Sequence, residues 1–197
     1  MDFKHPHPVG PASPIILLAA LALFALLVAL KSGKGAGESG ARRSRRSILG
    51  IIVQTLGFAV VGAGTVRIGL PPASPAAIGQ AAVILFLSGV TCWLFAASKR
   101  ALGRNWSIVA RTRSEHELVT WGPFAYLRHP IYSALFLWLL AMAVALGHHD
   151  GLIAGIPLYW IGTILRIREE EKLLRAQFGA DYDAYAARVK RFVPGII

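Results

Sequence analysis

Long apolar runs, separated by short polar connections, dominate this sequence and limit the folds open to it. About 20 apolar residues in a helix cross the hydrocarbon core of a bilayer. The chain of 197 residues is 55% hydrophobic and 16% charged, with a mean hydropathy of +0.54, which is too apolar for a soluble domain. The runs cover residues 15–30, 48–66, 78–97, 131–147 and 152–165. We therefore predict an all-α, polytopic membrane helix bundle of about five transmembrane helices that forms a single domain over residues 1–197.

The fifth run is short and contains Pro157. A proline inside a helix removes one backbone hydrogen bond, but neighbouring helices can satisfy the group that it frees. A kinked or partly re-entrant span therefore fits this run as well as a straight one.

The positive charge of the chain is concentrated in alternate connections between the runs. Residues 31–47 and 99–128 are rich in Lys and Arg, whereas the connection at 71–77 reads PPASPAA and residues 148–150 read HHD. The positive-inside rule therefore predicts that the N-terminus is outside and the C-terminus is cytoplasmic. Because the stronger positive cluster follows the first run, we expect that run to remain a helix rather than to be cleaved as a signal peptide.

The distribution of the basic residues also indicates which partners to expect. A net charge of +11 would suit a nucleic-acid binder, but the basic residues lie in membrane-flanking loops, so we expect membrane lipids and no nucleic acid.

The single Cys92 leaves no intrachain disulfide and no cysteine-rich zinc site. His148, His149 and Asp150 could suggest a metal site, but neighbouring histidines in a short turn are usually solvated, so we predict no metal. The sequence does not indicate an oligomeric state.

A polar helix should follow the fifth run. Its apolar residues recur at three- and four-residue steps between Ile167 and Phe192, which is the pattern of an amphipathic helix. We expect this helix to lie against the cytoplasmic face, with Gly179 as its weak point and Pro194 at its end.

Two linked motifs in the second half of the chain carry the functional signal. Residues 116–134 read HELVTWGPFAYLRHPIYSA, and residues 168–194 read REEEKLLRAQFGADYDAYAARVKRFVP. The first resembles the HxLVxxGxYxxxRHPxYxG signature of the isoprenylcysteine carboxyl methyltransferase family, and the second is similar to the EExxLxxxFGxxYxxYxxxVxRxxP ending of that family. The preceding GRNWS at 103–107 is similar to bacterial members, so we expect the chain in a bacterial inner membrane. The first two apolar runs match the family only in hydrophobicity.

The resemblance implies a methyltransferase that uses S-adenosylmethionine, holds it within about residues 100–194 and has no Rossmann domain. The sequence itself has no glycine-rich dinucleotide fingerprint. Two residues depart from the family pattern: Phe124 stands where Tyr is usual, and Ala134 replaces a glycine. By motif position, the resemblance assigns these residues to the cofactor: His116, Glu117, Leu118, Val119, Phe124, His129, Pro130, Ile131, Tyr132 and Glu170.

Arg166 is the candidate for the catalytic and substrate-binding role. It lies four residues before Glu170, so a continuous helix would place both on one face. The family register assigns Arg166 to the acceptor, and a guanidinium could bind a carboxylate in two-point fashion. The alternative is an arginine that only snorkels to the membrane interface. Likewise, residues 169–171, all Glu, could be a solvated face.

Several functions remain open from sequence alone. The leading hypothesis is methyl transfer to a lipophilic or prenylated acceptor that enters from the bilayer. The acceptor could be a prenylated cysteine carboxylate, a phospholipid amine or a small thiol, and Arg166 favours an anionic one. The rival from another class is a non-catalytic transport or assembly protein. A transporter is expected to carry ionisable residues within its spans, and residues 78–97 and 131–147 contain no charged residue.

Overall fold

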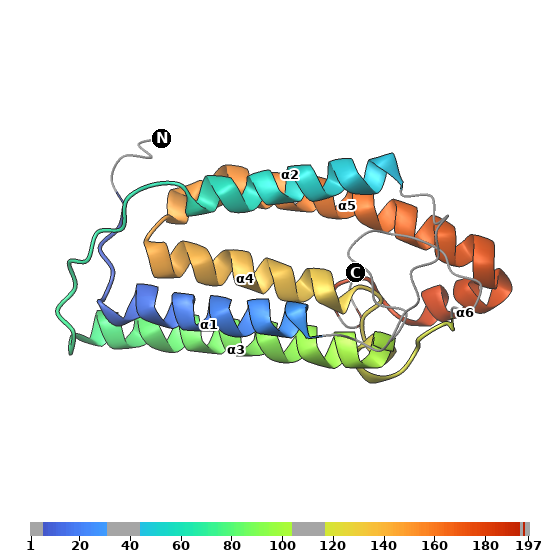
Figure 1. Ribbon diagram of the computed structural model, residues 1–197, viewed down its shortest axis with the longest axis horizontal. Coiled ribbons are helices and arrows are strands. Elements are labelled where there is room, and N and C mark those ends of the chain that lie inside the picture. The colour runs from blue at the N-terminus through green and yellow to red at the C-terminus, as the bar shows by residue number, and fades with distance from the viewer. Residues whose placement is uncertain (1–5, 31–43, 104–116, 194, 196–197) are drawn as a thin grey trace.

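The protein is a bundle of long helices joined at their ends (Figure 1). The computed structural model describes residues 6–30, 44–103, 117–193 and 195. Short 3₁₀ turns occur at Gly122–Ala125 and His149–Gly151. Within these described ranges the backbone forms isolated β-bridges but no strand. The α-helices are α1 Ala12–Ala29, α2 Arg45–Gly62, α3 Pro75–Leu102, α4 Pro130–Leu146, α5 Leu152–Phe178 and α6 Ala180–Arg188.

Each of the five predicted apolar runs lies largely within one of the helices α1 to α5, and the fifth run forms the first half of α5. Helices α1, α2, α3 and α5 are long and apolar enough to cross a membrane, and α4, with 17 residues, is slightly shorter. The large apolar side chains on the outer faces, such as Phe86 and Trp93 of α3, are more than half exposed, as expected for residues that face lipid. The prediction of an all-α, polytopic membrane bundle is therefore confirmed.

Helix α4 lies between two helix pairs. Figure 1 shows α2 beside α5 on one side of α4 and α1 beside α3 on the other. The core of the bundle forms around α4, where Leu139, Ala141, Ala143 and Ala145 have no exposed surface. Trp138 of α4 stacks on Phe24 of α1, with ring centroids 5.8 Å apart.

Glycines allow α2 and α5 to approach at backbone distance. A Cβ atom built on Gly162 would lie 2.5 Å from the backbone nitrogen of Gln54 and 2.6 Å from the carbonyl oxygen of Gly50. Likewise, a Cβ atom built on Gly57 would lie 2.9 Å from the carbonyl oxygen of Gly155. Membrane helices that lack side chains at the contact gain close van der Waals packing, which is a main source of association in lipid. The two helices therefore form one tightly packed pair.

Two features fix the ends of the bundle. At the end where α4 leads into α5, His148 is not simply solvated, since its ring nitrogens lie 2.9 Å and 3.1 Å from the carbonyl oxygens of Val61 and Thr65. At the other end, buried Lys99 of α3 donates to the carbonyl oxygens of Leu27, Val28 and Leu30. These carbonyls end α1 and have no helical partners of their own, so the ammonium caps α1.

The last predicted helix differs in part from the structure. Helix α5 contains Pro157 but continues unbroken through Arg166 to Phe178, so the fifth span and the polar helix are one element. The predicted weak point at Gly179 is a true break, with φ +52°, a conformation that glycine adopts without strain. The predicted helix end at Pro194 is wrong, because α6 ends at Arg188. Beyond it the backbone extends and pairs with the loop before α4, with Arg128 N to Lys190 O at 2.8 Å.

Candidate functional site

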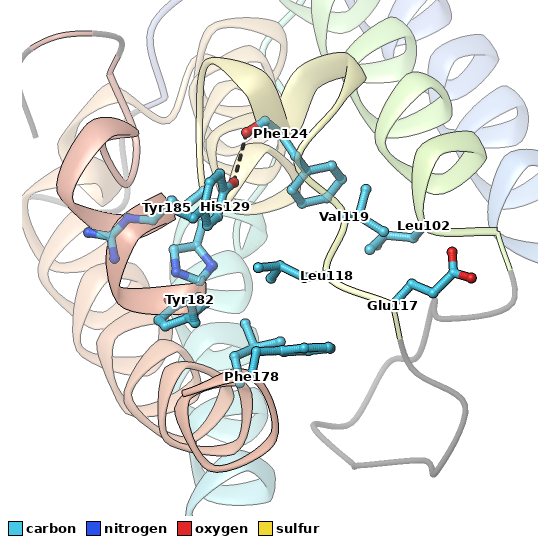
Figure 2. Close-up of a pocket in the computed structure, with 11 residues that line it drawn as sticks. Leu102, Glu117, Leu118, Val119, Phe124, His129, Phe178, Tyr182 and Tyr185 are labelled. Carbon is cyan, nitrogen blue, oxygen red and sulfur yellow. Dashed lines mark hydrogen bonds between the residues drawn. The ribbon is translucent and has the colours of Figure 1, made fainter. Parts of the chain in front are cut away.

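A pocket lies at the end of the bundle where α6 folds back (Figure 2). Side chains from α3, the loop before α4, α5 and α6 surround it, and most of them are apolar or aromatic. The lining residues are Leu102, Glu117, Leu118, Val119, Phe124, Arg128, His129, Leu174, Phe178, Tyr182 and Tyr185. A mostly apolar pocket with a few polar groups is typical of a small-molecule site.

The pocket contains about half of the residues that the motifs assigned to the cofactor. Glu117, Leu118, Val119, Phe124 and His129 line it, and Figure 2 shows Leu118 facing Phe178 across the cavity. His116 lies outside the described residues. The other four assigned residues do not line this pocket. They are Pro130, Ile131 and Tyr132, which follow His129 in the chain, and Glu170, which lies on α5.

Helix α6 supplies a wall of the pocket that the sequence analysis did not assign. The break at Gly179 turns the chain so that Tyr182 and Tyr185 are buried against the loop before α4, and the Tyr185 hydroxyl donates to the carbonyl of Phe124 at 2.7 Å. Burial raises the pKa of Tyr182 and of Tyr185, so both phenols stay protonated and can act as donors at neutral pH. The sequence did contain a signal for this wall, since the second motif specifies a tyrosine at both positions.

Glu171 holds together three segments behind the pocket. Its side chain accepts two hydrogen bonds from Arg191, at 2.9 Å and 2.8 Å, and one from Arg128 at 3.0 Å. His129 Nε2 lies 3.3 Å from the same carboxylate. Glu171 is only 3% exposed, so it does not belong to a solvated acidic face. It connects α5 to the RHP motif and to the segment after α6, and a buried carboxylate with several cationic donors is stable in its ionised form.

Glu170, beside it on α5, belongs to a second group of polar side chains. The Tyr132 hydroxyl donates a hydrogen bond to the Glu170 carboxylate, and His129 Nδ1 lies 3.8 Å from the same side chain. Pro130 is the first residue of α4 and is buried, while Ile131 is half-buried. His129 therefore lies between the two groups, because it lines the pocket and also reaches both glutamates.

Arg166 joins this second group from one helical turn before Glu170. Its guanidinium carbon lies 5.0 Å from the centre of the Tyr132 ring, a cation–π geometry. Its Nη1 donates to the Oε1 atom of Gln54 at 2.9 Å. Arg166, Tyr132 and Glu170 thus gather where α4 meets α5, next to the pocket rather than on its described wall. Gln54, on α2, was not among the predicted site residues.

The fold and the site define a multi-pass helical membrane protein with a pocket and a polar cluster at one end of the bundle. Residues 81–176 match the sequence model of the isoprenylcysteine carboxyl methyltransferase family. The segment from α3 to the last turns of α5 is therefore similar to this family, as the two motifs predicted.

Individual relatives agree with this assignment. The chain is 36% identical over 94 residues to protein-S-isoprenylcysteine O-methyltransferase of Schizosaccharomyces pombe, which covers 47% of this chain and 40% of that protein. It is also 36% identical over 94 residues to protein-S-isoprenylcysteine O-methyltransferase B of Arabidopsis thaliana, covering 47% of this chain and 48% of the relative. The chain thus matches about half or less of the length of these relatives.

A solved structure extends the likeness over nearly the whole chain. The structure of a eukaryotic intramembrane Ras methyltransferase, an isoprenylcysteine carboxyl methyltransferase, superposes with a TM-score of 0.62. The superposition covers 95% of this chain and 69% of the other, at 21% sequence identity. At this identity the likeness establishes the fold, including the helices α1 and α2 that precede the family match.

Proposed function

We propose that this protein is an integral membrane methyltransferase that transfers a methyl group from S-adenosylmethionine to a lipophilic carboxylate, such as that of a prenylated cysteine. One observation supports this most directly: Tyr132 contacts both Glu170 and Arg166, so an acidic and a cationic side chain lie together beside an aromatic pocket. The curated relatives, named as protein-S-isoprenylcysteine O-methyltransferases, support the same reaction.

The pocket has the side chains that such a cofactor needs. S-adenosylmethionine has a flat aromatic base, two ribose hydroxyls, a carboxylate and two cationic groups, and it supplies an electrophilic methyl group when bound. Leu118 and Phe178 offer apolar surface for the base, and Glu117 and Glu170 offer acceptors for hydroxyl or cationic groups. His129 can donate to the carboxylate. These residues fit the cofactor without a metal ion.

Arg166 would hold the acceptor. A guanidinium carries N–H donors in a planar fork that matches a carboxylate, and the ring of Tyr132 restrains its position from one side. A carboxylate is already ionised at neutral pH, so the protein needs no general base to activate it. The residues of this chain would therefore contribute mainly by aligning the acceptor and excluding water.

The proposed orientation places this site in the cytoplasm and the N-terminus outside, with the chain in a bacterial inner membrane. Most described basic residues flank the site end of the bundle, among them Arg100, Arg128 and Arg191, as the positive-inside rule requires. Labelling of terminal tags in intact cells tests this orientation. We expect only an N-terminal tag to react with a membrane-impermeant reagent, and a C-terminal tag labelled from outside would overturn the assignment.

A transfer assay on the detergent-purified protein tests the reaction itself. We expect methyl transfer from labelled S-adenosylmethionine to a prenylated cysteine with a free carboxylate, and no transfer to its amide. Transfer only to a phospholipid amine or a small thiol would replace the acceptor class. Absence of cofactor binding would instead favour the transport or assembly hypothesis.

Arg166 variants separate acceptor binding from cofactor binding. We expect Arg166→Ala to leave cofactor affinity nearly unchanged and to reduce methyl transfer by at least about 10-fold, with only partial recovery in Arg166→Lys, because a point charge cannot make a two-pronged contact. An arginine that serves only as an interface anchor would be replaced almost fully by Lys. Normal transfer by a folded Arg166→Ala variant would remove this residue from the site.

A further inference from the structure

A buried glutamine in the middle of α2 contacts Arg166. Gln54 is 4% exposed, and its Oε1 atom accepts the hydrogen bond from Arg166 Nη1 at 2.9 Å. Its Nε2 atom donates to the hydroxyl of Thr163 on α5 at 2.9 Å. A buried amide inside a membrane helix is costly unless its polar atoms are bonded, and here both are.

The chemistry of the three side chains determines which way the amide points. A guanidinium has only donors, so Gln54 must present its oxygen to Arg166 and its nitrogen to Thr163. The reversed amide would place N–H groups against the guanidinium. Thr163 therefore stabilises the orientation in which Gln54 can hold Arg166, although Thr163 itself lies one turn away from that arginine on α5.

The glycine contacts between α2 and α5 keep this geometry rigid. A Cβ atom on Gly50 would lie 2.6 Å from Cγ of Arg166, and one on Gly162 would lie 2.5 Å from the backbone nitrogen of Gln54. The aliphatic part of the Arg166 side chain thus lies against the backbone of Gly50. The backbone of Gln54, which carries the amide side chain, is in direct contact with α5. On another side, the Tyr132 ring restrains the guanidinium at 5.0 Å.

We propose that Gln54 is a positioning residue, which acts through Arg166 by fixing the plane of the guanidinium that receives the acceptor carboxylate. This inference rests on the proposed function. The family match covers residues 81–176 and so leaves Gln54 without a role. Helix α2 would then be a part of the acceptor site and not only a membrane anchor. Fixing a flexible arginine before the acceptor arrives removes an entropic cost of binding.

Replacement of Gln54 by Glu distinguishes positioning from a purely structural contact. Glu has nearly the same shape and can still accept from Arg166 and from Thr163, so the protein should fold with equal or greater thermal stability. Its carboxylate, however, would compete with the acceptor for the guanidinium. We expect the KM for the prenylated carboxylate to rise at least about 10-fold while the Kd for the cofactor changes by less than about 2-fold. A structural role alone predicts an unchanged KM, which would overturn the proposal.

Variants at Thr163 test the action through the amide. Thr163→Val removes the hydroxyl that receives Gln54 Nε2, and we expect kcat/KM to fall by about 5- to 10-fold, whereas Thr163→Ser should restore it. Thr91→Val is a matched control, because it removes another buried hydroxyl bond between helices, to the carbonyl of Ala134, away from Arg166. Equal loss in Thr91→Val and Thr163→Val would overturn the proposal.

The results also separate this inference from the proposed function. If the unmodified protein transfers no methyl group to any carboxylate, the proposed function fails and the inference fails with it. If the unmodified protein is active and Gln54→Glu retains its KM for the acceptor, only the inference fails. Gln54→Leu, which loses both hydrogen bonds, should combine a raised KM with lower thermal stability.

Discussion

Tyr132 and Glu170 join the two sequence motifs of this protein directly, since the Tyr132 hydroxyl on the first turn of α4 donates to the Glu170 carboxylate on α5. Tyr159 lies on α5 about three turns before Glu170, and its hydroxyl donates in turn to the backbone carbonyl of Tyr132. Helices α4 and α5 are thus connected by polar bonds where the site lies and by aromatic packing further from it.

The contact between Tyr132 and Glu170 leads to a prediction about cofactor binding. His129→Ala, Tyr132→Phe and Glu170→Ala should each weaken the binding of S-adenosylmethionine by roughly 10-fold or more, because each removes a hydrogen-bonding group beside the pocket. Binding of the labelled cofactor to purified protein measures the effect. Tyr126→Phe is the control, since Tyr126 is 70% exposed in the same loop. Unchanged affinity in all three site variants would place the cofactor elsewhere.

A second prediction concerns the buried carboxylate of Glu171, which binds both Arg128 and Arg191. Glu171→Gln should lower the free energy of unfolding by about 3 kcal/mol, because the buried carboxylate is the shared charge partner of Arg128, which is 10% exposed, and of the half-exposed Arg191. Thermal unfolding in detergent measures the loss. Asp183→Asn removes an acidic partner of Arg175 at the surface, where the Asp183 side chain is 63% exposed, and should cost less than about 1 kcal/mol. Similar effects of the two substitutions would contradict the buried network.

A third prediction tests the glycine contacts between α2 and α5. Gly162→Ala should destabilise the bundle by about 1 to 3 kcal/mol, because its Cβ would meet backbone atoms of α2 that cannot move independently. Gly89→Ala in α3 is a matched control, since a Cβ there would meet nothing within 4 Å. Alanine favours the helix over glycine, so Gly89→Ala should be neutral or slightly stabilising. A Gly162→Ala variant as stable as this control would argue against close packing of α2 on α5.

A fourth prediction concerns the cap that Lys99 forms on α1. Lys99→Met keeps much of the side-chain volume but leaves the terminal carbonyls of Leu27, Val28 and Leu30 without this donor. We expect a loss of about 1 to 3 kcal/mol and faster proteolysis after α1, with partial recovery in Lys99→Arg. The neighbouring Arg100 is exposed, so Arg100→Met should have little effect on stability. Equal protease resistance of Lys99→Met and the unmodified protein would exclude the cap.

The sequence predicted the helices well and the contacts between them poorly, for a physical reason. Apolar runs and a glycine break are local features, so the five spans and the turn at Gly179 could be predicted from composition and spacing. The end of α6 could not, because the chain leaves the helix at Val189 to pair with the loop before α4, a contact between distant segments.

The same limit applies to the site. The motifs led to five residues that line the pocket, but Glu171 was indistinguishable from its neighbours in a run of three glutamates, and only the fold buries it among Arg128 and Arg191. Gln54 gave a weak signal as an amide in an apolar run. Its partner could not be predicted, because the approach of α2 to α5 depends on where glycines on both helices meet.

The position of Gln54 outside the matched segment has a consequence for how relatives of this protein diverge. Two proteins can share every residue of the motifs and still restrain their arginine from different helices, because the early part of the chain is free to change in sequence while keeping its place in the bundle. Acceptor preference can then evolve in α2 without any change in the recognisable motifs. Structural superposition of the helices, rather than sequence alignment, is the comparison that will detect such changes.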